Sequence, residues 1–244
     1  MIDIRNVKKK FGRNEVLKGV NLIITKGETL VVIGKSGCGK SVLLKHIIGI
    51  LKPDEGEIFF EGVDIVKMKL KEIYKIRAKF GFLFQGAALF DSMTVEENVG
   101  LGLKENTRMS EKDILEVVTE KLELVGLPGT HKMKPSDLSG GMKKRVSLAR
   151  SLATNPEYIL YDEPTTGLDP VMSDSIDGLI KELADRLKVT SVVVTHDIFT
   201  VYSVADKVAM MEDGKIYFHG TPKELVETTD PVIRNFLNRT DKKI

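Results

Sequence analysis

Residues 34–41 read GKSGCGKS, and this short stretch decides the fold. It fits the pattern G-x-x-x-x-G-K-[S/T], in which the backbone N–H groups of a glycine-rich loop surround phosphate groups. The loop follows the β-rich run TLVVI at 29–33 and precedes the helical run SVLLKHII at 41–48, which is the context that the pattern requires. The sequence therefore predicts a nucleotide-binding α/β protein, with Lys40 on the β- and γ-phosphates and the Ser41 hydroxyl as a Mg²⁺ ligand.

Two acids follow a second apolar run, YILYDEP at 158–164. An aspartate at the end of a buried strand, here Asp162, is the type of residue that holds Mg²⁺ beside a phosphate loop. The adjacent Glu163 is placed to polarise an attacking water as a general base. Without the upstream loop, the same Asp-Glu pair is equally typical of a solvated strand end.

A second glycine pair lies in DLSGGMKKR at 137–145 and opens a helical pattern that places Met142, Val146, Ala149 and Leu152 on one face. Free N–H groups at a helix start also suit phosphate, so the chain carries two candidate phosphate sites. The basic residues Lys143, Lys144 and Arg145 are interpreted as a solvated helix face.

The composition excludes several classes of protein. With 37 Lys plus Arg against 35 Asp plus Glu, the net charge of +2 gives no long-range attraction for nucleic acid. The single cysteine, Cys38, cannot form an internal disulfide and is interpreted as a small residue that fits the loop. The N-terminus lacks the apolar region of a signal peptide, and the apolar runs are far shorter than the roughly 20 residues that span a bilayer, which predicts a cytosolic location.

The remaining pattern predicts one domain over residues 1–240. Strands are expected at 16–24, 57–65, 80–85 and 191–197, a hairpin at 207–220 turning at Asp213-Gly214, and a helix after the N-cap pair Asp169-Pro170. Residues 91–138 show few strand signals, which predicts a helical insertion. The α/β core is accordingly assigned to 1–90 and 139–220, and a C-terminal helix and tail to 221–244.

The order of these motifs resembles that of ABC-transporter ATPase subunits across essentially the whole chain. GKSGCGKS is similar to Walker A, LSGG at 138–141 to the signature motif, YILYDE to Walker B and TGLD at 166–169 to the D-loop. Gln85 resembles the Q-loop glutamine, His196 the switch histidine and Phe11 the A-loop aromatic, although each alone also fits an ordinary structural residue. The resemblance implies a P-loop NTPase core with a β subdomain and an inserted helical signature subdomain.

The resemblance also implies the roles of individual residues. It assigns catalysis to Lys40, Glu163 and His196, and Mg²⁺ binding to Ser41, Gln85 and Asp162. It assigns ATP contacts to Phe11, Gly34, Lys35, Ser36, Gly37, Cys38, Gly39, Lys40, Ser41 and Val42.

The second glycine pair is explained by the family's dimer. In this family two subunits pack head to tail around two MgATP molecules, so Ser139, Gly140 and Gly141 would bind the partner's nucleotide, with Asp169 at the dimer seam. The small and apolar residues 86–90 that follow Gln85 suit close approach of a membrane permease.

The runs QGAALFDSMTV and LSGGMKKRVSLAR, with Met142 where glutamine is usual, are similar to those of Mla or MCE-associated ATPases. This resemblance implies phospholipid or other hydrophobic cargo, a permease linked to an MCE-type lipid-binding protein, and a peripheral position at the cytoplasmic face of the inner membrane. Three alternatives stay open: an importer ATPase for another solute, a soluble ABC ATPase, and a nucleotide-dependent scaffold that does not hydrolyse ATP. The single cassette disfavours the second, and Glu163 with His196 disfavours the third.

Overall fold

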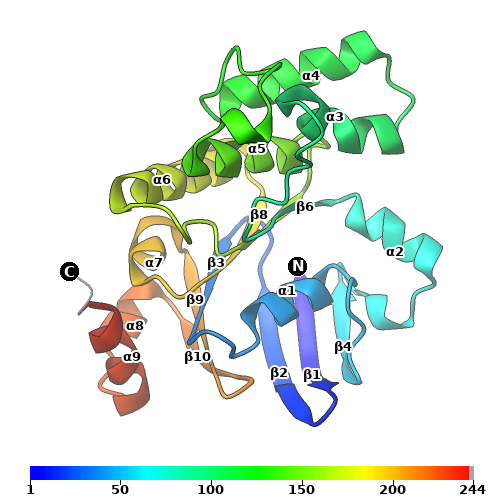
Figure 1. The fold of residues 1–244 in the computed structure, drawn as a ribbon. Helices are drawn as coiled ribbons and strands as arrows, with labels where there is room; N and C mark the ends of the chain where they lie inside the picture. Colours follow the sequence, from blue (N-terminus) through cyan, green and yellow to red (C-terminus); the bar gives the residue numbers. More distant parts are fainter. Residues whose placement is uncertain (242–244) are drawn as a thin grey trace.

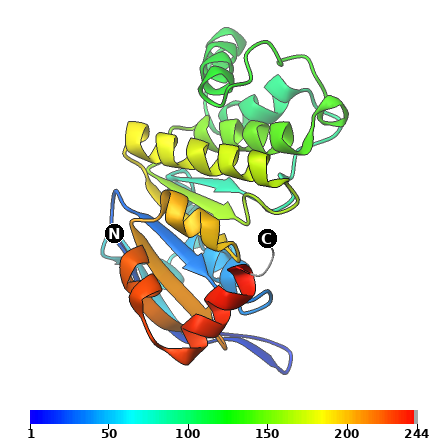
Figure 2. The same cartoon turned by 90° about the vertical axis from the view of Figure 1, so that its left-hand side faces the viewer.

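The computed structural model describes residues 1–241, and within them the strands form two sheets. Figures 1 and 2 show the green helices α3, α4 and α5 at one end of the molecule and the blue strands of the N-terminal sheet toward the opposite end. Residues 242–244 of the predicted tail lie outside the described part of the chain.

The N-terminal sheet is antiparallel and has the strand order β2-β1-β4-β5. Its strands are β1 (Ile2–Phe11), β2 (Asn14–Ile24), β4 (Glu55–Phe60) and β5 (Val63–Asp64). The sequence predicted one strand over 57–65, but a turn at Glu61-Gly62 with φ angles of 49° and 86° divides it into β4 and β5. Glycine adopts this left-handed backbone without the steric cost of a Cβ, which explains the interruption.

The central sheet has the strand order β10-β9-β3-β8-β7-β6, in which all neighbours are parallel except β9 and β10. Its strands are β3 (Thr29–Ile33), β6 (Phe80–Leu83), β7 (Tyr158–Asp162), β8 (Thr190–Thr195), β9 (Lys207–Glu212) and β10 (Lys215–Gly220). Every residue of β3, β7 and β8 is buried, as expected for parallel strands covered on both faces. The carboxyl ends of these three neighbouring strands therefore meet at one edge, where ligands bind in open α/β sheets.

Helices surround this sheet (Figure 1). They are α1 (Lys40–Ile47), α2 (Leu70–Arg77), α3 (Val95–Asn106), α4 (Glu111–Leu124), α5 (Gly140–Leu152), α6 (Pro170–Leu187), α7 (Ile198–Val204), α8 (Pro222–Glu227) and α9 (Pro231–Asp241), with short 3₁₀ turns at Ile65–Lys67 and Pro135–Asp137. The predicted N-cap is confirmed, because the Asp169 carboxylate accepts from Met172 N at 3.0 Å at the start of α6. The predicted hairpin is confirmed as β9 and β10.

The hydrophobic core consists of two clusters on opposite faces of the central sheet. Along β3, Val31 and Ile33 join the cluster beneath α5 and α6, whereas Leu30 and Val32 join the cluster that contains α1 and the N-terminal sheet. This alternation follows from the two-residue period of a strand. Burying an apolar side chain completely contributes about 1.5–3 kcal/mol to the free energy of folding, so the many buried residues of this sheet hold the edge that carries the site in place.

The limits of the predicted helical insertion and tail remain a prediction.

Candidate active site

The loop between β3 and α1 supplies the first part of the site. Gly37 and Gly39 have φ angles of 82° and 108°, a backbone region that L-residues with side chains rarely adopt. Gly39 is also the N-cap of α1, and a Cβ built there would lie 2.9 Å from Leu17 Cδ2. The glycines therefore allow a tight loop that ends at the positive end of the α1 dipole.

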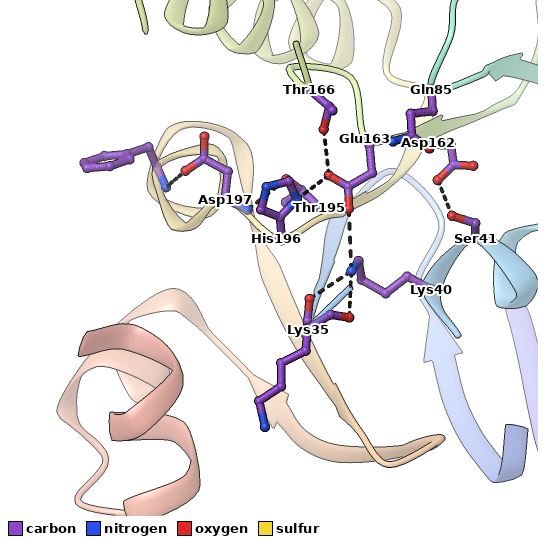
Figure 3. A network of polar contacts seen from close by, with 12 residues as sticks. Lys35, Lys40, Ser41, Gln85, Asp162, Glu163, Thr166, Thr195, His196 and Asp197 are labelled. Atoms are coloured by element: carbon purple, nitrogen blue, oxygen red, sulfur yellow. Dashed lines mark hydrogen bonds and ion pairs between the residues drawn. The ribbon is translucent and has the colours of Figure 1, made fainter. Parts of the chain in front are cut away.

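The Lys40 ammonium group is buried inside this loop. Its Nζ donates to Gly34 O at 2.8 Å and to Lys35 O at 3.3 Å, and it lies 3.5 Å from Glu163 Oε1 (Figure 3). Only 5% of Lys40 is exposed. A buried cation of this kind requires compensating negative charge or dipoles. A phosphate carries a full negative charge and forms stronger hydrogen bonds to an ammonium than neutral carbonyl groups do, so it would stabilise Lys40 better.

Ser41 and Asp162 form the second element of the site. The Ser41 hydroxyl donates to Asp162 Oδ1 at 2.6 Å, although the two residues are 121 positions apart in the sequence. Burial raises the pKa of the Asp162 carboxyl group, and the hydrogen bond from Ser41 opposes that shift. Figure 3 places Gln85 beside this pair. Hydroxyl, carboxylate and amide oxygens are the ligands that Mg²⁺ prefers, so this group could hold that ion.

Glu163 and His196 are brought together at the ends of β7 and β8. The Glu163 Oε2 atom lies 2.8 Å from His196 Nδ1 and accepts from the Thr166 hydroxyl at 3.1 Å (Figure 3). Glu163 also has a φ angle of 50°, an unusual backbone conformation for a residue with a side chain. Strained residues of this kind occur at functional sites when neighbouring contacts hold them.

A cavity of about 330 Å³ lies beside these groups, within the size range of small-molecule sites. Phe11 lines the cavity with 47% of the residue exposed, and the Lys9 ammonium lies over its ring at 5.7 Å from the centroid. The exposed part of the ring could still stack on a ligand. The lining residues are Phe11, Val16, Ser36, Gly37, Gly39, Lys40, Ser41, Val42, Gln85 and Glu163. The sequence does not predict Val16 as a lining residue, because a valine in a strand carries no sign of a ligand contact.

Residues 35–38 of the loop line a neighbouring hollow of about 350 Å³. The Lys35 ammonium pairs with Glu212 at 2.6 Å, so only the main chain of Lys35 faces Lys40. Cys38 lines the same hollow and is half-buried. The predicted nucleotide contacts of Lys35 and Cys38 would therefore come from their backbone.

The position of Cys38 predicts a labelling experiment. Burial raises the pKa of the Cys38 thiol, so the reactive thiolate is scarce at neutral pH and labelling with maleimide should accelerate as the pH rises. MgATP should slow this labelling about tenfold or more, since nucleotide in the loop would order it and restrict access. Mass spectrometry of the single cysteine gives the rate; equal rates with and without MgATP would contradict the placement of nucleotide at this loop.

The second glycine pair lies away from the cavity of its own chain. Ser139 is the N-cap of α5 and accepts from Met142 N at 3.3 Å, and both Ser139 and Gly140 are exposed. None of the residues 138–141 lines the cavity around Lys40 among the residues that the structure describes. Asp169 is likewise exposed, at the start of α6. This end of α5 is thus open to a second molecule.

The interpretation of residues 143–145 as a solvated helix face is wrong for two of them. Lys144 is only 5% exposed, and its Nζ donates to the carbonyl oxygen of Gln85 and, at 3.3 Å, to that of Glu163. Arg145 donates to Val125 O at 2.5 Å and to the Ser175 hydroxyl at 2.7 Å. These residues are inward-facing because α5 contacts β6 on one side and α3, α4 and α6 on others.

Comparison with known proteins places this site in a family context. Residues 17–166 match the family described as ABC transporter. The chain is 41% identical over 237 residues to the probable ribonucleotide transport ATP-binding protein mkl of Mycobacterium leprae, covering 97% of this chain and 68% of that protein. It thus spans about two thirds of the length of that relative.

A second relative has nearly the same length as this chain. The intermembrane phospholipid transport system ATP-binding protein MlaF of Haemophilus influenzae is 40% identical over 237 residues, covering 97% of this chain and 90% of MlaF. Among solved structures, a dimeric post-hydrolysis ATP-binding cassette bound to ADP and Pi is 36% identical, with a TM-score of 0.83 and coverage of 91% of this chain and 99% of that one.

Proposed function

The chain belongs to the ABC transporter family of ATPases, and from this premise we propose that it is the motor subunit of a phospholipid transporter. The sequence-based predictions of the family, the P-loop α/β fold and the ATPase activity are confirmed by the comparisons. One observation carries the proposal for the chemistry: Lys40, the Ser41–Asp162 pair and the Glu163–His196 pair converge beside one cavity.

In the proposed site, ATP occupies this cavity with its adenine on Phe11 and its phosphates in the loop of residues 34–41. The residues present fit Mg²⁺, because Ser41, Asp162 and Gln85 offer oxygen ligands beside the loop. Bound Mg²⁺ would neutralise charge on the β- and γ-phosphate oxygens. Lys40 supplies the ammonium that contacts the same oxygens.

The Glu163 carboxylate is the proposed general base. It orients a water toward the γ-phosphate and accepts its proton, a role that contributes roughly 10²- to 10⁴-fold to such rates. His196 holds the carboxylate through the 2.8 Å contact, and Thr166 holds the same oxygen atom. Both contacts leave Glu163 Oε1 directed at the Lys40 side of the cavity.

The exposed end of α5 supports a head-to-tail homodimer with two ATP sites. Ser139 and the first N–H groups of α5 would bind the γ-phosphate held by the partner subunit, with Asp169 at the seam. A solved relative is a dimeric cassette bound to ADP and Pi, which agrees with this arrangement. Closure would then depend on the γ-phosphate, because that group makes the contact between subunits.

A groove beside Gln85 is the proposed docking surface for a membrane permease. It has a volume of about 350 Å³ and is lined by Phe80, Gly81, Phe82, Phe84, Ala88, Phe90, Arg150, Ser151 and Thr154. Phe84 and Phe90 are 36% and 49% exposed, which provides the apolar contact area for a partner helix. Along residues 1–241, no helix combines the length and apolar character needed to cross a bilayer.

The phospholipid cargo is inferred from the relatives. MlaF is named for intermembrane phospholipid transport, and the match to it covers nearly the whole of both chains. We extend the proposal to an MCE-type lipid-binding protein on the same permease and to a peripheral position at the cytoplasmic face of the inner membrane. The mkl relative is named for ribonucleotide transport. An experiment must therefore decide between phospholipid and ribonucleotide as the transported cargo.

The test of cargo is reconstitution of the chain with its permease in phospholipid vesicles. ATP-dependent movement of labelled phospholipid is the expected result. A permease recovered by pull-down that moves only ribonucleotides or another solute would overturn the lipid assignment and leave the ATPase assignment intact.

The groove predicts the effect of a single substitution, Phe90→Arg. The backbone of Phe90 is held by Asn98, which donates to Phe90 O at 3.1 Å and accepts from Phe90 N at 2.8 Å, so only the side chain should change. Permease association should fall about tenfold or more, because a charge replaces an apolar contact, while ATP affinity stays within about twofold. Ile23→Arg, at a 51% exposed position on the N-terminal sheet, is the matched control. Equal association of the two variants would contradict this docking site.

A further inference from the structure

One face of α5 carries three donors that bind the backbone of the segment after β6. Lys144, Ser147 and Arg150 are spaced three residues apart, which places them along one side of the helix. Ser147 Oγ donates to Ala87 O at 2.9 Å, and Arg150 donates to Ala87 O at 2.8 Å and to Ala88 O at 2.7 Å. Lys144 Nζ donates to Gln85 O. We call these three residues the donor row.

The segment that the donor row binds has an unusual backbone. Ala87 and Ala88 have φ angles of 60° and 50°, a left-handed conformation that residues with a Cβ seldom adopt. Two consecutive residues of this kind persist only where the surroundings hold them. Ser147 and Arg150 of the donor row supply that restraint, because their hydrogen bonds go to the carbonyl groups of these residues.

Lys144 differs from the other two donors because it also reaches the site. Its Nζ lies 3.3 Å from the carbonyl oxygen of Glu163, the residue whose φ angle is 50°. The same ammonium group therefore contacts the backbone of Gln85 and the backbone of Glu163. Gln85 follows the end of β6, and Glu163 follows the end of β7. Burial lowers the pKa of the Lys144 ammonium group, and the charges of Asp162 and Glu163 oppose that shift.

We propose that Lys144 is a positioning residue that fixes the backbone of Glu163 relative to that of Gln85, and so couples the permease-facing segment to the general base. This proposal rests on the proposed function, in which Glu163 activates water and the groove beside Gln85 receives the permease. The ammonium has three N–H donors, and two of them hold carbonyl groups from the two segments. Movement of either segment changes the position of the other through this one group.

Loss of Lys144 should affect turnover more than nucleotide binding. Lys144 does not line the ATP cavity, and of the lining residues it contacts only Gln85 and Glu163, so Phe11 and the phosphate-binding loop stay in place. Without the ammonium, the carbonyl groups of Gln85 and Glu163 each lose a donor, and the Glu163 carbonyl keeps the Thr166 N–H at 3.3 Å. The Glu163 backbone is then less firmly held in its left-handed conformation. A shift of about 1 Å in a catalytic group can cost on the order of 100-fold in rate.

The experiment compares Lys144→Met, Lys144→Arg and the control Lys121→Met in the full chain. Lys121 is also 5% exposed, but it lies in α4 and pairs with Glu120. Lys121→Met therefore replaces an equally buried lysine with methionine at a position that does not contact the site. Lys144→Met should lower kcat about 10- to 100-fold and leave KM for ATP within about threefold. Lys144→Arg should restore kcat to within about threefold, and Lys121→Met should leave kcat unchanged.

A second measurement needs no turnover. The chain has no tryptophan, so Phe84→Trp provides a single tryptophan next to Gln85, which is excited selectively over the five tyrosines at about 295 nm. In that background, Lys144→Met should increase acrylamide quenching of the tryptophan about twofold or more, because the segment is no longer held, and Lys121→Met should not.

Two results would overturn the proposal: unchanged kcat and unchanged quenching in Lys144→Met, or an equal loss of kcat in Lys121→Met. Failure of the proposed function gives a different pattern. If Glu163→Gln retained full hydrolysis, the general-base assignment would fail, while the quenching result would still report whether Lys144 holds the segment.

Discussion

Lys40→Ala should abolish tight MgATP binding in a protein that remains folded. Lys40 carries the one ammonium group among the described residues that line the cavity. Two opposite charges about 4 Å apart at an effective dielectric constant of about 20 attract by roughly 4 kcal/mol, so the affinity should fall about 100-fold or more. Titration with a fluorescent ATP analogue measures this loss.

A matched variant separates the local effect from a general loss of positive charge. Lys18 lines the neighbouring hollow and pairs with Asp213, so Lys18→Ala removes a lysine close to the loop but outside the cavity. Its ATP affinity should stay within about threefold of that of the wild type. Unchanged affinity in folded Lys40→Ala, shown by an unaltered urea transition, would refute the assignment of the phosphate site.

The parts of the fold that could be predicted from the sequence are those encoded locally. The strand at 29–33, the glycine loop and the following helix occupy consecutive residues, and each has its own signal: β-branched residues, glycines at left-handed positions and a helical pattern. The same holds for the Asp169 cap and the 207–220 hairpin. A local motif is sufficient to predict the structure of a segment when the backbone conformation there depends on neighbouring residues alone.

The N-terminal sheet shows where local signals are insufficient. The sequence pattern predicts no strand over residues 2–11, where β1 pairs with both β2 and β4. The run Lys8, Lys9 and Lys10 obscures the alternation of buried and exposed residues, and register shifts interrupt the pairing. Long-range pairing stabilises this strand, and one sequence does not reveal its partners.

The burial of Lys144 is not predicted by the sequence, for a related reason. The helix that follows the glycine pair has an apolar face at Val146, Ala149 and Leu152, and residue 144 lies off that face. Its burial depends on carbonyl groups 59 and 19 positions away. A sequence pattern identifies the apolar side of a helix, but a polar residue bound to distant backbone leaves no periodic signal.

Glu163→Gln should bind ATP with nearly normal affinity and hydrolyse it about 10²- to 10⁴-fold more slowly. Glutamine keeps the size of the side chain and an oxygen that can contact Thr166, but it cannot accept the proton of the attacking water. The measurement is phosphate release, with His196→Ala as a comparison, since His196 contacts the same carboxylate oxygen at 2.8 Å. Normal hydrolysis by Glu163→Gln would exclude this residue as the base.

The slow variant also provides the test of the second glycine pair. Because Glu163→Gln retains the γ-phosphate, it should accumulate with MgATP as a closed dimer, measured by light scattering. Adding Ser139→Arg should prevent that dimer, because a bulky cation would occupy the exposed start of α5 where the partner's phosphate is expected. ATP affinity of the double variant should be unchanged in the monomer, since Ser139 does not line its own chain's cavity. A dimer that forms equally well with Ser139→Arg would show that the signature glycines do not bind nucleotide across the interface, and the open end of α5 would then need another partner.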